Sequence, residues 1–130
     1  MAGDNGQYFG DILTAARDNE AFRRVLSTSP HAQLVLMTLR PGEEIGEEIH
    51  QGNDQVLFAV EGSGESVLEG SKRSFSAGYL VVVPAGTRHN FINTGSQPLR
   101  LVTLYAPPDH RPGTVHETKA QAEADERDYP

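Results

Sequence analysis

The sequence contains no cysteine. Disulfide bonds, thiolate chemistry and cysteine-based zinc sites are therefore excluded. Any metal ion must be bound by histidine, carboxylate, amide or water ligands. These ligands favour a divalent first-row transition metal or zinc, so the candidate ions are iron, manganese, nickel and zinc.

Positive charge and long apolar segments are also scarce. The chain has 11 Lys and Arg residues against 18 Asp and Glu residues, which gives a net charge of −7. Nucleic-acid binding depends on basic patches, so we expect no nucleic-acid partner. No apolar run approaches the roughly 20 residues that span a bilayer, and residues 1–6 lack the basic and apolar regions of a signal peptide. We therefore expect a cytoplasmic protein with no membrane partner.

Turn residues divide the middle of the chain into short segments rich in apolar and β-branched residues. No amphipathic helix separates these segments, and the length of 130 residues suits one domain. The spacing predicts an all-β fold, an antiparallel sandwich or barrel, rather than βαβ units. The expected strands are residues 22–28, 32–40, 45–50, 55–61, 65–69, 72–76, 79–83, 89–93 and 99–106.

The two ends of the chain are expected to be partly helical. Residues 11–18 are suited to a short helix. Beyond Pro107-Pro108, residues 114–117 read Thr-Val-His-Glu and fit a capping box, which predicts a surface helix from Val115 to about Arg127. We divide the chain into an N-terminal extension (1–21), a barrel (22–108) and a C-terminal tail (109–130).

Residues 34–39 are apolar at almost every position. Such a strand is either buried on both faces within one chain, or it contributes one face to a dimer interface. We expect a homodimer.

Four side chains are candidates for a single metal site. Glu48 and His50 are two residues apart, so they point to the same side of a strand. Gln55 starts the next strand across a four-residue turn, and His89 starts a later strand just past the turn at 84–86. In a small closed barrel these two imidazoles, one carboxylate and one amide oxygen can converge and leave room for water or substrate, as catalytic metal sites do.

The spacing around His89 resembles a known pattern. Gly78-x5-Pro84-x-Gly86-x2-His89-x3-Asn93 matches every signature position of the second motif of the cupin superfamily. In the first cupin motif, Gly42 and Gly62 fall on the two glycine positions and His50 on the second histidine. Glu48 stands where the family has its first histidine, and Gln55 where it has glutamate. The resemblance covers roughly residues 33–106 and is closest to the small single-domain bacterial cupins described as mannose-6-phosphate isomerase-like.

The resemblance implies a double-stranded β-helix, or jelly-roll barrel, that is usually a homodimer. It also implies a divalent metal, which the family commonly binds with three histidines and one glutamate. Cupins include dioxygenases, isomerases, epimerases, decarboxylases and proteins without known catalysis, so the fold does not name a reaction.

The departures from the family pattern preserve the charge of the site, since one carboxylate is lost at Gln55 and one is gained at Glu48. Two histidines and one carboxylate also form the facial triad of non-haem iron oxygenases. We therefore expect Glu48, His50, Gln55 and His89 to bind a divalent metal. For Gln55, the role of an ordinary strand residue is almost as plausible as the role of a ligand.

Three functions remain open at this point. The first is a metal-dependent enzyme of isomerase or dioxygenase type that acts on a small polar molecule such as a sugar, keto or enol compound. The second is a non-catalytic cupin that binds a small ligand or a metal. The third is an interaction module with a vestigial site. No catalytic residue beyond the metal ligands and no organic cofactor is assigned.

Other polar residues carry weaker signals. His31, His110 and His116 have no partner at a metal-ligand spacing; His31 is expected on the surface, and the other two lie in the tail. Whether the tail closes over the barrel is open. Four further residues are possible cavity-lining side chains: Tyr79, Arg88, Arg100 and Tyr105.

Overall fold

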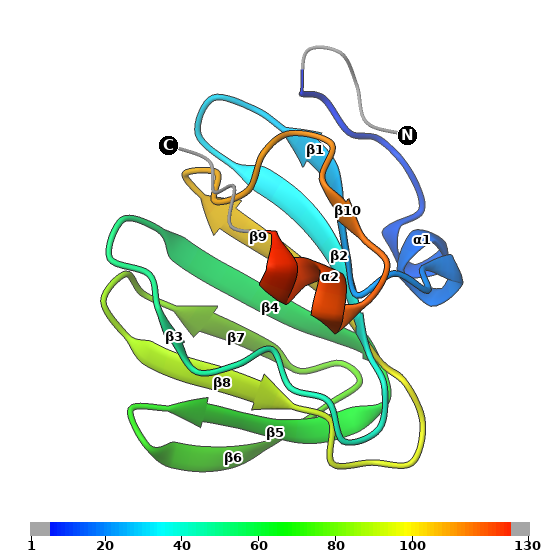
Figure 1. Cartoon of the computed structure of the whole chain (residues 1–130), viewed down its shortest axis with the longest axis vertical. Helices are drawn as coiled ribbons and strands as arrows, with labels where there is room; N and C mark the ends of the chain where they lie inside the picture. The colour runs from blue at the N-terminus through cyan, green and yellow to red at the C-terminus, as the bar shows by residue number, and fades with distance from the viewer. Residues whose placement is uncertain (1–5, 126–130) are drawn as a thin grey trace.

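The computed structural model describes residues 6–125 and shows two antiparallel β-sheets that face each other (Figure 1). The six-stranded sheet has the order β10-β1-β2-β9-β4-β7, and the four-stranded sheet has the order β3-β8-β5-β6. The elements are α1 (Ile12–Asp18), β1 (Arg23–Thr28), β2 (Gln33–Leu39), β3 (Glu48–Ile49), β4 (Asp54–Glu61), β5 (Ser63–Leu68), β6 (Ser71–Ser76), β7 (Leu80–Val83), β8 (Arg88–Ile92), β9 (Leu99–Ala106), β10 (Val115–His116) and α2 (Lys119–Ala124). The predicted all-β jelly-roll class is confirmed.

The main core lies between the two sheets. Each strand directs every second side chain inward, and these side chains form one continuous apolar cluster. Phe75 from the small sheet packs against Phe91 with ring centroids 5.1 Å apart. The six-stranded sheet contributes Met37, Leu57, Leu101 and Tyr105, among others, and Phe22 joins them from just before β1. This core fixes the two sheets relative to each other, and therefore fixes the side chains at the open end of the barrel.

Strand β2 is buried on both of its faces within a single chain. Val35, Met37 and Leu39 belong to the main core. Leu36 points the other way and joins a second cluster with Ala16 of α1. The helix therefore covers the outer face of this part of the sheet, and the apolar sequence of residues 34–39 no longer requires a dimer. The homodimer remains a prediction.

The strand expected at residues 45–50 is shorter than predicted, because regular pairing is limited to Glu48–Ile49. Gly46 has a φ of +112°, which takes the backbone out of the extended conformation. Its N–H donates to Asn90 Oδ1 over 2.9 Å instead of joining the ladder. A loop therefore leads into β3 and presents Glu48 at the rim of the barrel.

The helix predicted from Val115 onwards is wrong at its start. Thr114 does not cap a helix, because its hydroxyl donates to the carbonyl of Arg111 over 2.7 Å. Val115 and His116 instead form β10, which pairs with the start of β1. The N-cap is Thr118, whose hydroxyl accepts from the Gln121 N–H over 3.1 Å. The predicted end at Arg127 lies outside the described residues.

Helix α1 matches its prediction, and its N-cap Asp11 accepts from the Thr14 N–H. None of the helices in residues 6–125 is long and apolar enough to cross a membrane.

Two polar or small residues join the sheets. Gly62 carries the chain from β4 to β5 with a φ of +96°, and a Cβ there would lie 2.4 Å from the Pro98 carbonyl oxygen. Asn93 follows β8, and its amide donates to the carbonyls of Leu39 and Gln97, each over 2.9 Å. Both positions of the cupin pattern are therefore structural.

Candidate metal centre and its cavity

Strand pairing brings three of the four predicted ligands together. Glu48 on β3 is the register partner of His89 on β8, and His50 follows β3. One potential ligand atom from each of Glu48, His50 and His89 lies within 4.8 Å of the other two. The rings of His50 and His89 are 5.4 Å apart between centroids. These three residues are placed to hold a metal ion.

His89 is oriented by its own backbone. Its Nδ1 lies 2.8 Å from the Thr87 carbonyl oxygen. A carbonyl can only accept, so Nδ1 carries the hydrogen and Nε2 keeps a free lone pair. This Nε2 is buried and has no hydrogen-bond partner within residues 6–125. An imidazole held by a carbonyl in this way is prepared to bind a metal through Nε2.

Gln55 lies on β4 in the opposite sheet and is also fully buried. Its amide nitrogen donates to the Thr103 hydroxyl over 3.2 Å and to the Tyr105 hydroxyl over 3.1 Å. These two bonds fix the amide so that its oxygen is free. That oxygen is buried without a hydrogen-bond partner in the described part of the chain.

The unpaired atoms fit a metal site. A buried polar atom without a partner costs about 1–3 kcal/mol, and such atoms are rare in native structures. His89 Nε2 is left in this state beside a carboxylate and a second imidazole, and Gln55 Oε1 is left in the same state in the facing sheet. A divalent cation held by Glu48, His50 and His89 would satisfy His89 Nε2, and its charge would be partly balanced by Glu48.

His50 lies between two carboxylates. Its Nε2 is 3.2 Å from Glu48 Oε1, and its Nδ1 is 3.6 Å from Asp109 Oδ1. The hydrogen bond to Glu48 raises the pKa of His50 above its ordinary value; burial opposes this change, and Asp109 supports it.

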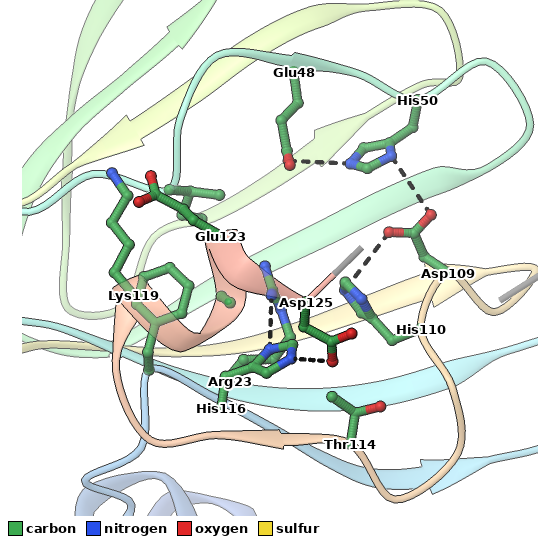
Figure 2. Close-up of a pocket in the computed structure, with 13 residues that line it drawn as sticks. Arg23, Glu48, His50, Asp109, His110, Thr114, His116, Lys119, Glu123 and Asp125 are labelled. Carbon is green, nitrogen blue, oxygen red and sulfur yellow. Dashed lines mark hydrogen bonds and ion pairs between the residues drawn. The ribbon is translucent and has the colours of Figure 1, made fainter. Parts of the chain in front are cut away.

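The C-terminal tail lies over the candidate centre, which sequence reasoning left open. Strand β10 pairs with the edge strand β1, and α2 lies between that edge and β3 (Figure 1). The cavity between them has a volume of about 450 Å³, which is in the range of small-molecule sites. Figure 2 shows Glu48 and His50 on one side of it, with the tail residues opposite.

The tail contributes residues that the sequence did not connect with the site. His110 and His116 both line the cavity, as do Asp109 and Asp125. No spacing pattern in the sequence predicts that these four residues line the cavity, because their position depends on the tail returning to β1. His31, in contrast, is exposed as expected.

His110 is a neutral imidazole next to the centre. Burial lowers its pKa to about 3, and the charge of Arg23 acts in the same direction. Its Nε2 lies 3.5 Å from Asp109 Oδ2, which is too long for a good hydrogen bond. Burial therefore outweighs the nearby carboxylate. Its ring meets Tyr105 edge to face, with centroids 5.1 Å apart.

None of the four side chains suggested as cavity-lining lines this cavity. Tyr79 is exposed, and Arg88 lies on the surface 3.6 Å from Glu47. Arg100 pairs with Glu20 and Glu61 away from the centre. Tyr105 is fully buried, where it contacts Gln55, His50 and His110, and burial raises its pKa.

Comparison with known proteins agrees with this architecture. Residues 35–105, more than half of the chain, match the cupin domain family (Cupin_2). The chain belongs to the cupin family. The resemblance carried by the glycine and histidine spacing is therefore confirmed, and the matched region contains all four predicted ligands.

Similar cupins are known from bacteria and a virus. This cupin is 48% identical over 122 residues to the uncharacterized protein YrkC of Bacillus subtilis, a match that spans 89% of this chain but only 66% of YrkC. It is 36% identical over 126 residues to the uncharacterized protein L612 of Acanthamoeba polyphaga mimivirus, spanning 94% of this chain and 79% of L612. The crystal structure of BH2720 from Bacillus halodurans aligns with a TM-score of 0.89 and 43% identity, over 91% of this chain and 94% of BH2720.

Proposed function

We propose that this cupin is a divalent-metal-dependent enzyme that acts on a small polar molecule, a sugar, keto or enol compound, by isomerase or dioxygenase chemistry. Glu48, His50, Gln55 and His89 are the proposed metal ligands. The observation that carries the proposal is the buried, unpaired His89 Nε2 in the group that it forms with Glu48 and His50. Gln55, whose oxygen is also buried and unpaired, is the proposed fourth ligand from the facing sheet.

Each ligand has a separate role in this proposal. Glu48 supplies the negative charge that a cation needs, and His89 supplies a lone pair whose direction is fixed by the Thr87 carbonyl. Gln55 supplies a neutral oxygen held in place by two hydroxyl groups. A bound divalent metal would act as a Lewis acid toward substrate oxygens, and a redox-active ion would add reactivity toward oxygen.

The cavity residues support chemistry beyond metal binding. Asp109 faces both His50 Nδ1 and His110 Nε2. At 3.6 Å from His50 Nδ1 this carboxylate acts on the ring through its charge rather than through a hydrogen bond, and it favours a hydrogen on Nδ1 when Nε2 is used as a ligand. The same carboxylate lines the cavity, so it is also the proposed group for moving a proton to or from a bound substrate.

The first experiment is metal analysis of the purified protein after reconstitution with Fe(II), Mn(II), Ni(II) or Zn(II). Wild type is expected to retain about one ion per chain, and His89→Ala to retain much less. His31→Ala is the matched control, because His31 is exposed and outside the cluster. Wild-type protein that retains no ion under any of these conditions would refute the proposal.

The second experiment separates catalysis from simple binding. Metal-loaded protein is tested for oxygen consumption with catechols and diketones, and for isomerisation of sugar phosphates. Turnover that disappears in His89→Ala supports the enzyme. Metal binding without turnover across the panel would favour the alternative, a non-catalytic cupin that binds a metal or a small ligand.

A further inference from the structure

Arg23, at the start of β1, is a buried cation without an acidic partner. Its side chain lines the cavity, and only 8% of the residue is exposed. No carboxylate within residues 6–125 lies at ion-pair distance from it, whereas Arg100, which is equally buried, pairs with both Glu20 and Glu61. A buried charge without a counter-charge is costly, so Arg23 needs an explanation that Arg100 does not.

The guanidinium group is only partly satisfied by the protein. Its Nη1 lies 3.2 Å from His116 Nδ1, and the Phe22 ring lies 5.3 Å away as a cation–π contact. Its Nε is buried with no hydrogen-bond partner among the described residues. One edge of the planar fork, with Nε on it, is therefore left without a partner.

A chain of contacts fixes the orientation of this unpaired edge of the guanidinium group. Arginine can only donate, so His116 Nδ1 must accept and the ring hydrogen lies on Nε2. That Nε2 lies 2.9 Å from Asp125 Oδ2. Arg23 and His116 are also direct register partners between β1 and β10. Strand pairing and hydrogen bonding thus hold the guanidinium in one place before any ligand arrives.

Arg23 lines the same cavity as Glu48 and His50, two of the candidate metal ligands. Figure 2 shows Arg23 and His116 on the side opposite Glu48 and His50. The charge of Arg23 also reaches across this space. It adds to burial in lowering the pKa of His110, and it opposes the rise that Glu48 causes in the pKa of His50.

We propose that Arg23 is an anion subsite that binds a carboxylate group of the substrate, while other oxygens of the same molecule face Glu48 and His50 across the cavity. This inference rests on the proposed function and narrows it to small carboxylic acids, such as keto or hydroxy acids, among the polar molecules considered above. The unpaired edge carries the Nε–H and a neighbouring N–H side by side, and this parallel pair of donors matches the two oxygens of a carboxylate.

The acidic groups around the cavity favour a carboxylate over a phosphate. Asp109, Glu123 and Asp125 line the same space, and a phosphate dianion would be repelled more strongly by them than a carboxylate with a single charge. A single unpaired guanidinium compensates one negative charge. The charges around the cavity therefore favour a group with a single negative charge beside Arg23.

The test uses a ladder of α,ω-dicarboxylates from oxalate to adipate, each compared with its monoamide, in titration calorimetry at fixed ionic strength. The proteins are wild type, Arg23→Gln, Arg23→Lys and Arg24→Gln, each metal-free and Mn(II)-loaded. Arg24 is the matched control, because it precedes Val25 on the same strand but points away and donates to Asn19 Oδ1 over 3.1 Å. Circular dichroism confirms that each variant is folded.

At least one dicarboxylate is expected to bind wild type at least about tenfold more tightly than its monoamide binds. The same dicarboxylate should bind Arg23→Gln at least about tenfold more weakly than it binds wild type. Arg23→Lys, which keeps the charge but loses the planar fork, should fall between wild type and Arg23→Gln. Arg24→Gln should match wild type, and the Mn(II) affinity of all four proteins should agree within about twofold.

Two results would overturn the subsite. One is the absence of Arg23-dependent binding in both metal-free and metal-loaded protein. The other is tighter Arg23-dependent binding of inorganic phosphate than of any dicarboxylate. These results are distinct from failure of the proposed function, which would appear as loss of Mn(II) binding in wild type while dicarboxylate binding to metal-free protein still depends on Arg23.

Discussion

Glu48 and His89 face each other directly across the antiparallel β3–β8 pair. Side chains in such a pair have Cβ atoms about 4.5–5.5 Å apart, which is close enough for both to bind one ion. Only two residue pairs define this short ladder, so the register of two strands sets the geometry of the centre. A shift by one residue would turn one of the two side chains to the other face of the sheet.

Replacing Glu48 by Gln should weaken divalent-metal binding at least about tenfold, since even changes outside the ligand shell typically cost 10- to 100-fold. The amide keeps the size of the side chain but removes its charge. Glu47→Gln is the control, because Glu47 is exposed and pairs with Arg88. Competition with a chelator of known affinity measures the effect, and equal affinities for both variants would remove Glu48 from the ligand set.

Replacing Gln55 by Glu should restore the ligand type that cupins usually have at this position. We expect metal affinity to follow the order Glu, Gln, Leu at residue 55. The metal-free Gln55→Glu protein should lose about 1–3 kcal/mol of unfolding free energy, because a buried carboxylate replaces a neutral amide. Added metal should then raise its melting temperature more than that of wild type. Identical metal affinities in all three proteins would make Gln55 a purely structural residue.

His110 should make the protein sensitive to mild acid. Its pKa is lowered to about 3 by burial in the folded protein, whereas an unfolded histidine titrates near 6.5. Between these values only the unfolded state takes up the proton, so stability is full above about pH 6.5 and falls as the pH decreases, by up to about 1.4 kcal/mol per pH unit. Urea unfolding of wild type and His110→Gln between pH 7 and pH 4 measures the difference. A wild type that loses no more stability than the variant would mean that Asp109, not burial, controls His110.

The homodimer predicted from sequence should form through the outer face of the six-stranded sheet. Register places Leu34, Leu104, Val56 and Val82 in one row across β2, β9, β4 and β7. Leu104 is 37% exposed and Val82 is 55% exposed, while the neighbouring row at Leu36 is covered by α1. A second copy of the chain would cover the open row.

Sedimentation should therefore give a dimer for wild type and a monomer for Val82→Glu, which places a charge in that apolar row. Ser74→Glu, on the exposed part of β6, is the control and should remain dimeric. A monomeric wild type at micromolar concentrations would contradict the prediction.

Much of the fold followed from local sequence. Turn residues and apolar segments placed most strands within one or two residues, because alternation and turn chemistry act over a few residues. The two main errors had local causes that only the structure reveals. Gly46 interrupts the strand before Glu48, and Val115 and His116 join β1 instead of starting a helix.

The sequence by itself indicated that Glu48, His50 and His89 would lie together, and it indicated the family of the barrel that carries them. The two-residue spacing of Glu48 and His50 and the turn that precedes His89 depend only on neighbouring residues, so they can be read without knowledge of the tertiary structure. Only the tertiary structure decided what surrounds that centre. Arg23 and His116 are 93 residues apart in sequence, and no periodicity links them. They meet because burial of the core brings the tail back to the edge of the six-stranded sheet. This non-local pairing places a buried cation across a cavity from Glu48 and His50.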